Sequence, residues 1–285
     1  MSEILQVENL SKKYKKFSLK DVNFSIPKGF IMGLIGKNGA GKTTTIKLLL
    51  NNITRSSGTI NILGLDNIGE ELAIKEQIGV IFDSNCFPVS WKIRDVEKAV
   101  RLFYSTWNTS KFENYLSKFH IEPTKKVSEL SRGMQMKLML ACALSYDNQL
   151  LILDEPTSGL DPVSRDQILS ILSEYVEDEN RSVLFSTHIT SDLEKVADYI
   201  TYLKDGEVFY SGDKDEFIDS FRIIKGGLNE LTEALEDKLV GIRKYSTGFD
   251  GLIRTQDTKD LSGFLIDPVT IDDIIIFTNE EDENA

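Results

Sequence analysis

The chain has 285 residues, 41% of them hydrophobic and 27% charged, which is the composition of a globular protein with room for one large domain and an appendage. No stretch approaches the about 18 consecutive apolar residues of a membrane-spanning helix, and no signal-peptide pattern opens the chain, so we expect neither a span nor a leader. The formal net charge of -12 argues against nonspecific binding to nucleic acid. Cys86 and Cys142 lack metal-ligand spacing and indicate free thiols in a reducing cytosol.

The first 35 residues are predicted to form strands. Residues 3–10 and 17–26 alternate apolar and polar side chains, Pro27–Gly29 is a turn signal, and residues 30–35 form an apolar run typical of a buried strand. Tyr14 lies among lysines between the first two strands. It could stack on a nucleotide base or be an ordinary half-buried hairpin tyrosine, and the spacing alone does not choose between these roles.

A glycine-rich loop follows the third predicted strand, and its sequence fits the pattern G-x-x-x-x-G-K-[ST]. A helix with Ile46, Leu49 and Leu50 on one face comes next, so the strand, loop and helix context supports the motif against a chance glycine-rich turn. Backbone N–H groups of such a loop and the helix dipole bind phosphate, which predicts a nucleoside triphosphate as ligand. The residues expected to contact it are Gly36, Asn38, Gly39, Ala40, Gly41, Lys42, Thr43 and Thr44. Lys42 would reach the β- and γ-phosphates and Thr43 would ligate Mg²⁺.

The middle of the chain is predicted to be a helical insertion in an α/β framework. Residues 55–64 indicate a turn and a strand, 70–76 a short helix, and 78–82 a buried strand. From Ser84 to Ser128 strand signals are few, and residues 131–144 form a further helix. The apolar side chains of the insertion are expected to pack between helices rather than bind a ligand. They are Val96, Val100, Leu102, Phe103 and Trp107 on one helix and Phe112, Tyr115, Leu116 and Phe119 on another.

Two apolar strands in the second half of the chain end in side chains suited to catalysis. Residues 150–153 precede Asp154 and Glu155, and residues 182–186 precede Thr187 and His188, with a helix between the two strands. This order predicts a right-handed parallel unit whose strand ends meet at a ligand crevice. Asp154 would hold Mg²⁺ through water, Glu155 would polarise the water that attacks the γ-phosphate, and His188 would contact that phosphate. A structural histidine is the alternative for His188, but its place beside a phosphate loop and paired carboxylates favours function.

The rest of the chain is predicted to add a hairpin over residues 200–210, a helix over 213–221, and a small α+β appendage. The appendage would contain a helix over residues 229–239 and a last helix that opens at Pro268. Glu280–Glu283 is expected to be a solvated acidic tail.

In this ordered set of motifs the chain resembles the nucleotide-binding subunits of ATP-binding-cassette (ABC) transporters, over residues 1 to about 220. Gly36–Thr43 matches the family's Walker A motif, and Leu150–Glu155 its Walker B motif. Leu130–Met134 stands at the position of the LSGGQ signature, and Ser158–Asp161 matches the D-loop. His188 matches the switch histidine, and Tyr14 the aromatic residue that stacks on adenine.

The resemblance implies an α/β fold, the ABC type of P-loop NTPase. This fold has a β-rich N-terminal subdomain, a mainly parallel core sheet and a helical subdomain at about residues 84–146, giving an ATPase domain over 1–220 and an accessory region over 221–285. It also implies ATP and Mg²⁺ as cofactors and a head-to-tail dimer, most simply of identical subunits. Two ATP molecules would lie between the subunits, each held by the Walker motifs of one chain and by Ser131 and Gly133 of the other. Asp161 would contribute to nucleotide binding from the D-loop.

Two motifs depart from the family pattern. The signature has Arg132 where glycine is usual and Met134 where glutamine is usual, while Ser131 and Gly133 are kept. Asp83 follows the strand of residues 78–82, where the family has its Q-loop glutamine. We expect Asp83 to approach the Mg²⁺ shell and to couple it to a membrane partner. Residues 84–91 would line the groove for that partner, with Phe87 and Trp91 as candidate contacts or as internal packing.

The function that these features favour is an ATPase that powers export of a drug, antibiotic or peptide through a separate ABC-2 type permease at the cytoplasmic face of the membrane. The alternative is a non-transport ABC ATPase that acts on the ribosome or on nucleic acid. A single P-loop, the absence of sustained heptads and the acidic charge argue against it. A third possibility, a nucleotide sensor without turnover, is disfavoured because Lys42, Asp154, Glu155 and His188 are all present.

Overall fold

The computed structural model describes residues 2–259, 261 and 263–280, with Glu280 described by its backbone only. The chain forms two compact units, Met1–Ser211 and Gly212–Ala285. The domain boundary predicted from the sequence was residue 220. Helix α8 (Lys214–Asp219) falls in the second unit, where it contacts strand β11 (Phe221–Gly226). The acidic tail predicted at Glu280–Glu283 lies outside the described residues, apart from the Glu280 backbone.

The first sheet of the larger unit is antiparallel and has the strand order β2-β1-β4-β5. Alternation explains the first strand, because Leu5 and Val7 are buried while Gln6 and Glu8 are exposed. The predicted strands over residues 3–10 and 17–26 are therefore confirmed. The strands are β1 (Glu3–Lys13), β2 (Ser18–Pro27), β4 (Ser57–Ile62) and β5 (Leu65–Asp66).

The second sheet has the order β10-β9-β3-β8-β7-β6 and is mainly parallel, as predicted. Its central strands are buried on both faces, which is why they read as apolar runs without alternation. Strand β8 lies between β3 and β7, so the carboxyl ends of these three strands are neighbours at one edge of the sheet. The strands are β3 (Ile31–Ile35), β6 (Ile78–Ile81), β7 (Leu150–Asp154), β8 (Ser182–Thr187), β9 (Tyr199–Lys204) and β10 (Glu207–Asp213).

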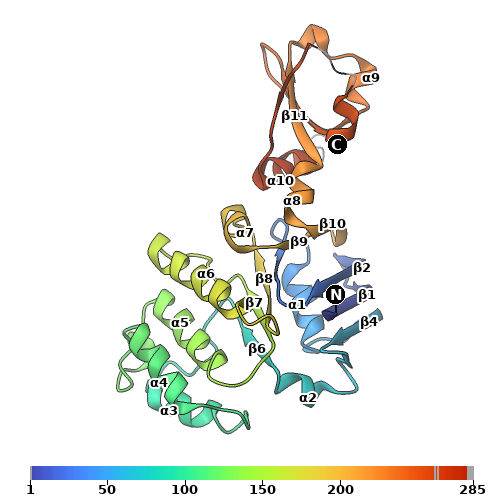
Figure 1. Ribbon diagram of the computed structural model, residues 1–285. Coiled ribbons are helices and arrows are strands. Elements are labelled where there is room, and N and C mark those ends of the chain that lie inside the picture. Colours follow the sequence, from blue (N-terminus) through green and yellow to red (C-terminus); the bar gives the residue numbers. More distant parts are fainter. Residues whose placement is uncertain (1, 260, 262, 281–285) are drawn as a thin grey trace. The chain divides into compact units, whose positions relative to one another are not determined.

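Helices cover both faces of the parallel sheet, with α1 on one side of β7 and β8 and with α5 and α6 on the other (Figure 1). Ile46 and Leu49 of α1 share a core with residues of β1 and β2 and with Ile152 and Leu184 of the parallel sheet. Helix α1 therefore lies between the two sheets, which fixes the loop in front of it. Within the described residues, no helix has the length and apolar character needed to cross a membrane. The helices are α1 (Lys42–Leu49), α2 (Glu71–Lys75), α5 (Arg132–Ala143), α6 (Pro162–Val176) and α7 (Thr190–Val196).

The predicted helical insertion is present, but its first helix is shorter than the apolar pattern indicated. Helix α3 (Ile93–Val100) ends before Leu102, Phe103 and Trp107, so the predicted single helix through these residues is wrong. Leu102 and Phe103 are 80% and 75% exposed, and they do not belong to the core either. The second helix, α4 (Thr109–Lys118), is confirmed.

Tertiary contacts explain why α3 ends at Val100. The Tyr104 ring stacks on that of Tyr146, with centroids 3.6 Å apart. The backbone N–H of Asn108 donates to the Ser145 carbonyl at 2.7 Å, and the Asn108 side chain then caps α4. Both contacts hold the connection against the end of α5, and a helix continued through residue 107 could not make them.

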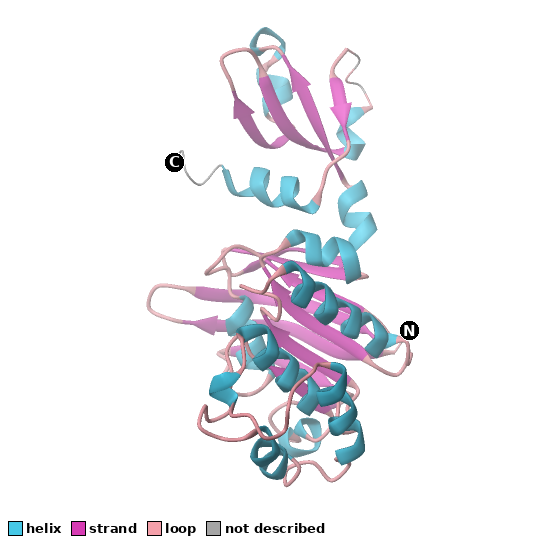
Figure 2. Ribbon diagram, turned by 90° about the vertical axis from the view of Figure 1, so that its left-hand side faces the viewer, coloured by secondary structure: helices cyan, strands magenta, loops and turns pink. Residues whose placement is uncertain are grey.

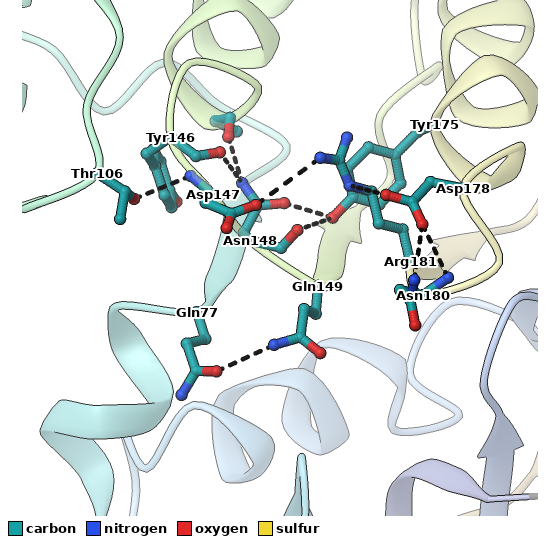
Figure 3. Close-up of polar contacts among 11 residues, drawn as sticks. Gln77, Thr106, Tyr146, Asp147, Asn148, Gln149, Tyr175, Asp178, Asn180 and Arg181 are labelled. Carbon is teal, nitrogen blue, oxygen red and sulfur yellow. Dashed lines mark hydrogen bonds and ion pairs between the residues drawn. The ribbon is translucent and has the colours of Figure 1, made fainter.

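A polar network at the amino-terminal edge of the parallel sheet joins several elements around Asn148 (Figure 3). The Tyr175 hydroxyl of α6 donates to the Asn148 carbonyl at 3.0 Å, and the Tyr146 hydroxyl donates to the Ile78 carbonyl at 2.8 Å. Gln149 donates to the Gln77 side chain at 3.1 Å. Burial raises the pKa of both Tyr146 and Tyr175, so their hydroxyls stay protonated and can act as donors.

The smaller unit is the predicted α+β appendage, with a sheet of order β12-β13-β11-β14. Figure 2 shows its strands in magenta with short helices around them. Helix α10 (Ile271–Glu280) lies so close to β12 that a Cβ on Gly241 would fall 2.1 Å from the Phe277 carbonyl oxygen. The predicted helix over residues 229–239 is wrong in length, since α9 spans only Glu233–Glu236, because strand β12 begins at Leu239. The other strands are β12 (Leu239–Lys244), β13 (Phe249–Arg254) and β14 (Leu265–Asp267).

Candidate nucleotide-binding site

A cavity of about 720 Å³ opens at the carboxyl ends of β3, β7 and β8. It brings together parts of the chain that are distant in sequence, namely the β1–β2 connection, the glycine-rich loop, the end of β7 and the end of β8. Its size suits a nucleotide, since small-molecule pockets commonly enclose about 300–1,000 Å³. The lining residues are Tyr14, Lys16, Phe17, Lys37, Asn38, Gly39, Gly41, Lys42, Thr43, Thr44, Asp83, Glu155, Ser158 and His188.

The glycine-rich loop is held in its shape by close backbone packing. A Cβ on Gly36 would lie 2.4 Å from the Leu203 carbonyl oxygen, so only glycine fits there. Gly41, with φ of 115°, precedes α1 directly and packs beneath Phe17, where a Cβ would lie 3.1 Å from the ring. Ala40 is buried below the loop. The first N–H groups of α1 therefore face the cavity at the positive end of the helix dipole.

Lys42 is buried beside the loop, although it is a lysine. Its Nζ donates to the Gly36 carbonyl at 2.7 Å and lies 3.4 Å from Glu155 Oε1. Only 6% of the Lys42 side chain is exposed, so the ammonium is largely desolvated and held near the cavity floor. A phosphate oxygen entering the cavity would meet a cation that is already in place.

Asp154, Thr43 and Ser186 form a second hydrogen-bonded group under the loop. The Thr43 hydroxyl donates to Asp154 Oδ1 at 3.3 Å, and the Ser186 hydroxyl donates to the same oxygen at 2.6 Å. The Ser186 oxygen also accepts the Glu155 N–H at 2.9 Å. These contacts follow from the strand register, which pairs Asp154 with Ser186.

Glu155 and His188 face each other in the cavity. His188 Nδ1 lies 2.6 Å from Glu155 Oε2, and Lys42 contacts the other carboxylate oxygen. Glu155 has a left-handed backbone with φ of 50°, which is costly for this residue type and turns its side chain out of the strand direction. The carboxylate is thereby placed between the lysine and the histidine.

Tyr14 and Asp83 both line the same cavity. Tyr14 is 44% exposed, with Lys12 Nζ 5.3 Å from its ring centroid, so the ring is available to a ligand. Asp83 follows β6, the strand next to β7.

Ser131, Gly133 and Asp161 do not line this cavity. They lie instead at two helix N-termini that contact each other. Ser131 caps α5 and Asp161 caps α6, where its carboxylate accepts the N–H groups of Val163 and Ser164. These bonds lower the pKa of Asp161, the one to Ser164 most. Within one chain, the three residues are thus separated from the loop.

Ser186 and Phe17 are part of the site but were not identified from the sequence. Ser186 could have been found as a polar residue near the carboxyl end of an apolar strand, two residues before His188. Phe17 gave no signal, because it reads as one of the apolar residues of the strand predicted over residues 17–26, and only the fold brings it over Gly41.

Comparison with known proteins gives a consistent picture. A family model described as ABC transporter matches residues 19–158. The bacitracin transport ATP-binding protein BcrA of Enterococcus faecalis is 31% identical over 211 residues, which cover 73% of this chain and 68% of BcrA. The lantibiotic transport ATP-binding protein SrtF of Streptococcus pyogenes is 33% identical over 215 residues, covering 74% of this chain and 92% of SrtF. A solved structure of an ATP-binding subunit of an ABC transporter superposes with a TM-score of 0.68 at 28% identity, covering 75% of this chain and 91% of that one.

The fold and the comparisons thus lead to one conclusion. The predicted P-loop ABC ATPase fold is confirmed by the solved structure and by the arrangement of loop, carboxylates and histidine at one edge of a parallel sheet. The chain belongs to the family of ABC transporter ATP-binding proteins, and it is an ATP-binding and ATP-hydrolysing subunit of such a transporter.

Proposed function

We propose that the chain binds ATP with Mg²⁺ in the cavity around Lys42 and hydrolyses it to power export through a separate membrane permease. The observation that carries this proposal is the cluster in which Glu155 contacts both Lys42 and His188 beside the phosphate loop. Relatives named for bacitracin and lantibiotic transport support a peptide antibiotic as the substrate class.

The phosphates would be held by the N–H groups of the loop and by Lys42. A γ-phosphate oxygen would compete with the Gly36 carbonyl and with Glu155 for the ammonium, so binding would release Glu155 toward the attacking water. Tyr14 would stack on the base. His188 would orient Glu155 through the bond at Nδ1 and leave its other ring nitrogen for the phosphate.

Mg²⁺ fits the donor set under the loop, because Thr43 and Asp154 offer oxygen atoms within 3.3 Å of each other. Mg²⁺ is commonly bound by one or two carboxylates together with substrate phosphates and water. When bound, the ion would neutralise charge on the β- and γ-phosphates. Thr43 and Asp154 would hold it, with Asp83 at the rim of the same cavity.

We expect Glu155→Gln to bind ATP but to hydrolyse it slowly. The amide keeps the size of the side chain but cannot accept a proton from water, so turnover should fall by roughly 10²–10⁴-fold. ATP affinity by calorimetry and phosphate release at saturating ATP are the measurements. Glu177→Gln, an exposed change at the end of α6, is the matched control. Hydrolysis by Glu155→Gln at the parent rate would refute the role of Glu155.

Each nucleotide would be completed by a second copy of this chain in a head-to-tail dimer. Ser131, Gly133 and Asp161 are kept at helix N-termini outside the cavity of their own chain, where they could meet the γ-phosphate held by a partner. Hydrolysis would remove this shared anion and open the dimer.

The groove beside Asp83 is proposed to receive a cytosolic helix of an ABC-2 type permease. A cavity of about 180 Å³ lies there, lined by Cys86 and Phe87 after β6 and by Phe103 after α3. Trp91 and Phe103 are 40% and 75% exposed, so they would offer apolar surface to a docked helix. A permease docked there would hold the ATPase at the cytoplasmic face of the membrane. Recovery of an integral membrane protein with the tagged chain from detergent-solubilised membranes tests this assignment, and recovery of ribosomes instead would contradict it.

Asp83→Asn is expected to weaken Mg²⁺ dependence and coupling to transport. The change removes one negative charge from the rim of the cavity, so the Mg²⁺ concentration for half-maximal ATPase activity should rise several-fold. Mg²⁺ titration of the ATPase rate is the measurement, with the exposed Asp237→Asn as control. An unchanged ATPase rate, Mg²⁺ dependence and transport would show that Asp83 has no such role.

A further inference from the structure

The side chain of Asp192 is completely buried in the larger unit, and it does not line the nucleotide cavity. Asp192 is the third residue of α7 and follows His188 by four residues along the chain. A carboxylate in a protein interior is costly unless its charge is paired and its oxygens are hydrogen-bonded. The partners of this carboxylate therefore show what holds α7 in place.

Both carboxylate oxygens of Asp192 accept hydrogen bonds from segments outside α7. The Thr157 hydroxyl donates to Oδ2 at 2.6 Å. Arg165 of α6 donates from Nε to Oδ1 and forms an ion pair with it, and its Nη2 donates to the Ser191 hydroxyl at 2.6 Å. Only 27% of the Arg165 side chain is exposed, so solvent screens this pair little. The charge of Asp192 is thus paired, and the start of α7 is fixed from two directions.

Thr157 connects this carboxylate to the segment that carries Glu155. Thr157 is itself buried and stands two residues after Glu155. The Ser158 N–H donates to the Glu155 carbonyl at 3.2 Å, and the Leu160 N–H donates to the Thr157 carbonyl at 3.2 Å. These turns leave few ways for Thr157 to move without Glu155.

The link from Asp192 back to His188 is also short. The Asp192 N–H donates to the Ile189 carbonyl at 3.1 Å, and the Ile189 N–H donates to the Thr187 hydroxyl at 2.9 Å. His188 therefore stands between a buried strand end and a helix start that are both held by hydrogen bonds. The bond between Thr157 and Asp192 joins the same two segments as the contact between Glu155 and His188.

We propose that Asp192 is a positioning residue for ATP hydrolysis, which keeps the His188 ring at the Glu155 carboxylate by holding α7 to the segment after Glu155. The inference rests on the proposed function in one respect, that Glu155 and His188 act in hydrolysis. The His188 side chain is 45% exposed, so its place 2.6 Å from Glu155 depends on the backbone that carries it as well as on its own packing.

Replacement of Thr157 tests the proposal, because a change at Asp192 would leave Arg165 unpaired and be strongly destabilising. Thr157→Val keeps the shape and removes the hydroxyl, and kcat should fall by roughly tenfold, less than the about 100-fold that a misplacement of 1 Å can cost. Thr157→Ser keeps the hydroxyl, and kcat should stay near the parent value. ATP affinity should be unchanged in both variants, since Thr157 does not line the cavity. A parent kcat in Thr157→Val, or an equal loss in Thr157→Ser, would overturn the proposal.

The His188 ring provides a readout that a loss of stability alone would not change. The chain has two histidines, and His120, which does not line the cavity, is the internal reference. In nucleotide-free protein with isotope-labelled histidine, Thr157→Val should shift the ring-nitrogen NMR signals of His188 toward those of Glu155→Ala, which removes the partner of Nδ1. Unshifted His188 signals in Thr157→Val would overturn the proposal even if kcat fell.

Thr201→Val is the matched control for loss of a buried hydroxyl. Thr201 is a fully buried threonine of β9, and its hydroxyl forms a hydrogen bond with that of Ser211 at 2.9 Å. Its replacement should lower the free energy of unfolding but leave kcat and the His188 signals at the parent values. The same loss of kcat and the same shift of the His188 signals as in Thr157→Val would assign the effect to stability and overturn the proposal.

His188→Ala tests the proposed function separately. ATP hydrolysis by His188→Ala at the parent rate would refute the role of His188, whereas shifted His188 signals in Thr157→Val would still support the positioning by Asp192. Slow hydrolysis by His188→Ala together with unshifted signals in Thr157→Val would refute the positioning and leave the proposed function in place.

Discussion

At the scale of single residues, Asp154 and Glu155 share one buried hydroxyl, that of Ser186. Ser186 donates to Asp154 and accepts from the Glu155 N–H, so it fixes the carboxylate under the loop and the strained backbone beside it. Such supporting partners hold a site in its productive geometry.

Ser186→Ala is therefore expected to lower ATP turnover by roughly 10–100-fold, as loss of supporting hydrogen bonds does at metal sites. It leaves the part-buried Glu155 N–H unpaired, so the free energy of unfolding should also fall by about 1–3 kcal/mol. Steady-state kinetics and urea unfolding are the measurements.

Ser182→Ala provides the control for that prediction. Ser182 is equally buried at the other end of the same strand, where its oxygen accepts the Gly29 N–H at 2.9 Å. Its loss should cost similar stability with little change in kcat. Equal loss of turnover in both variants would show that Ser186 acts only through stability.

The sequence predicted much of this site because its residues follow strands directly. Asp154, Glu155 and His188 stand at strand ends, where a parallel sheet collects them, and Lys42 opens the helix that follows the glycine-rich loop. Ser186 was missed because its role depends on the register of β7 and β8, and hydrophobic periodicity does not determine which residues of two buried strands pair.

At the scale of elements, the polar network around Asn148 joins α5, α6 and the start of β6 at the edge of the sheet opposite the site (Figure 3). Helix boundaries could not be predicted in this region from the sequence. Leu102 and Phe103 keep a helical period, but the stacking of Tyr104 on Tyr146 and the hydrogen bond from Asn108 to Ser145 end α3 earlier. Such tertiary contacts override local pattern.

Tyr175→Phe is expected to lower the free energy of unfolding by about 1–3 kcal/mol, because Asn148 loses the donor for its buried carbonyl. ATP affinity and kcat should stay near the parent values, since the network is remote from the cavity. Chemical denaturation and ATPase assays check both parts.

Tyr115→Phe on α4 is the matched change, because its hydroxyl makes no hydrogen bond to any residue that the structure describes. It should leave the free energy of unfolding almost unchanged. If Tyr175→Phe is as mild as Tyr115→Phe, the network contributes little to stability.

At the scale of the whole molecule, each of the two units has its own core. The larger unit is built around α1 and its two sheets, and the smaller around Ile224, Phe249 and Ile253. The sequence predicted an appendage, and no linker signal marks where the second compact unit begins, because Gly212 lies within β10.

Nucleotide is expected to stabilise only the larger unit. Scanning calorimetry should show two unfolding transitions, and ATP with Mg²⁺ at 100 times Kd should add about 2.7 kcal/mol to the one that contains the loop. Nucleotide-free buffer that contains Mg²⁺ is the control. A single transition that shifts as a whole on adding nucleotide would contradict independent unfolding.

The place of β8 between β3 and β7 has a consequence for how the chain folds while it is synthesised on the ribosome. The loop after β3 is synthesised early, the carboxylates after β7 much later, and β8 last of the three. Until β8 has emerged, no strand can bridge Ile31 and Leu151 through Val183, so the halves of the site stay unjoined. Nucleotide in the cell therefore cannot direct the first steps of folding. It can bind and stabilise only a chain whose central strands have already paired.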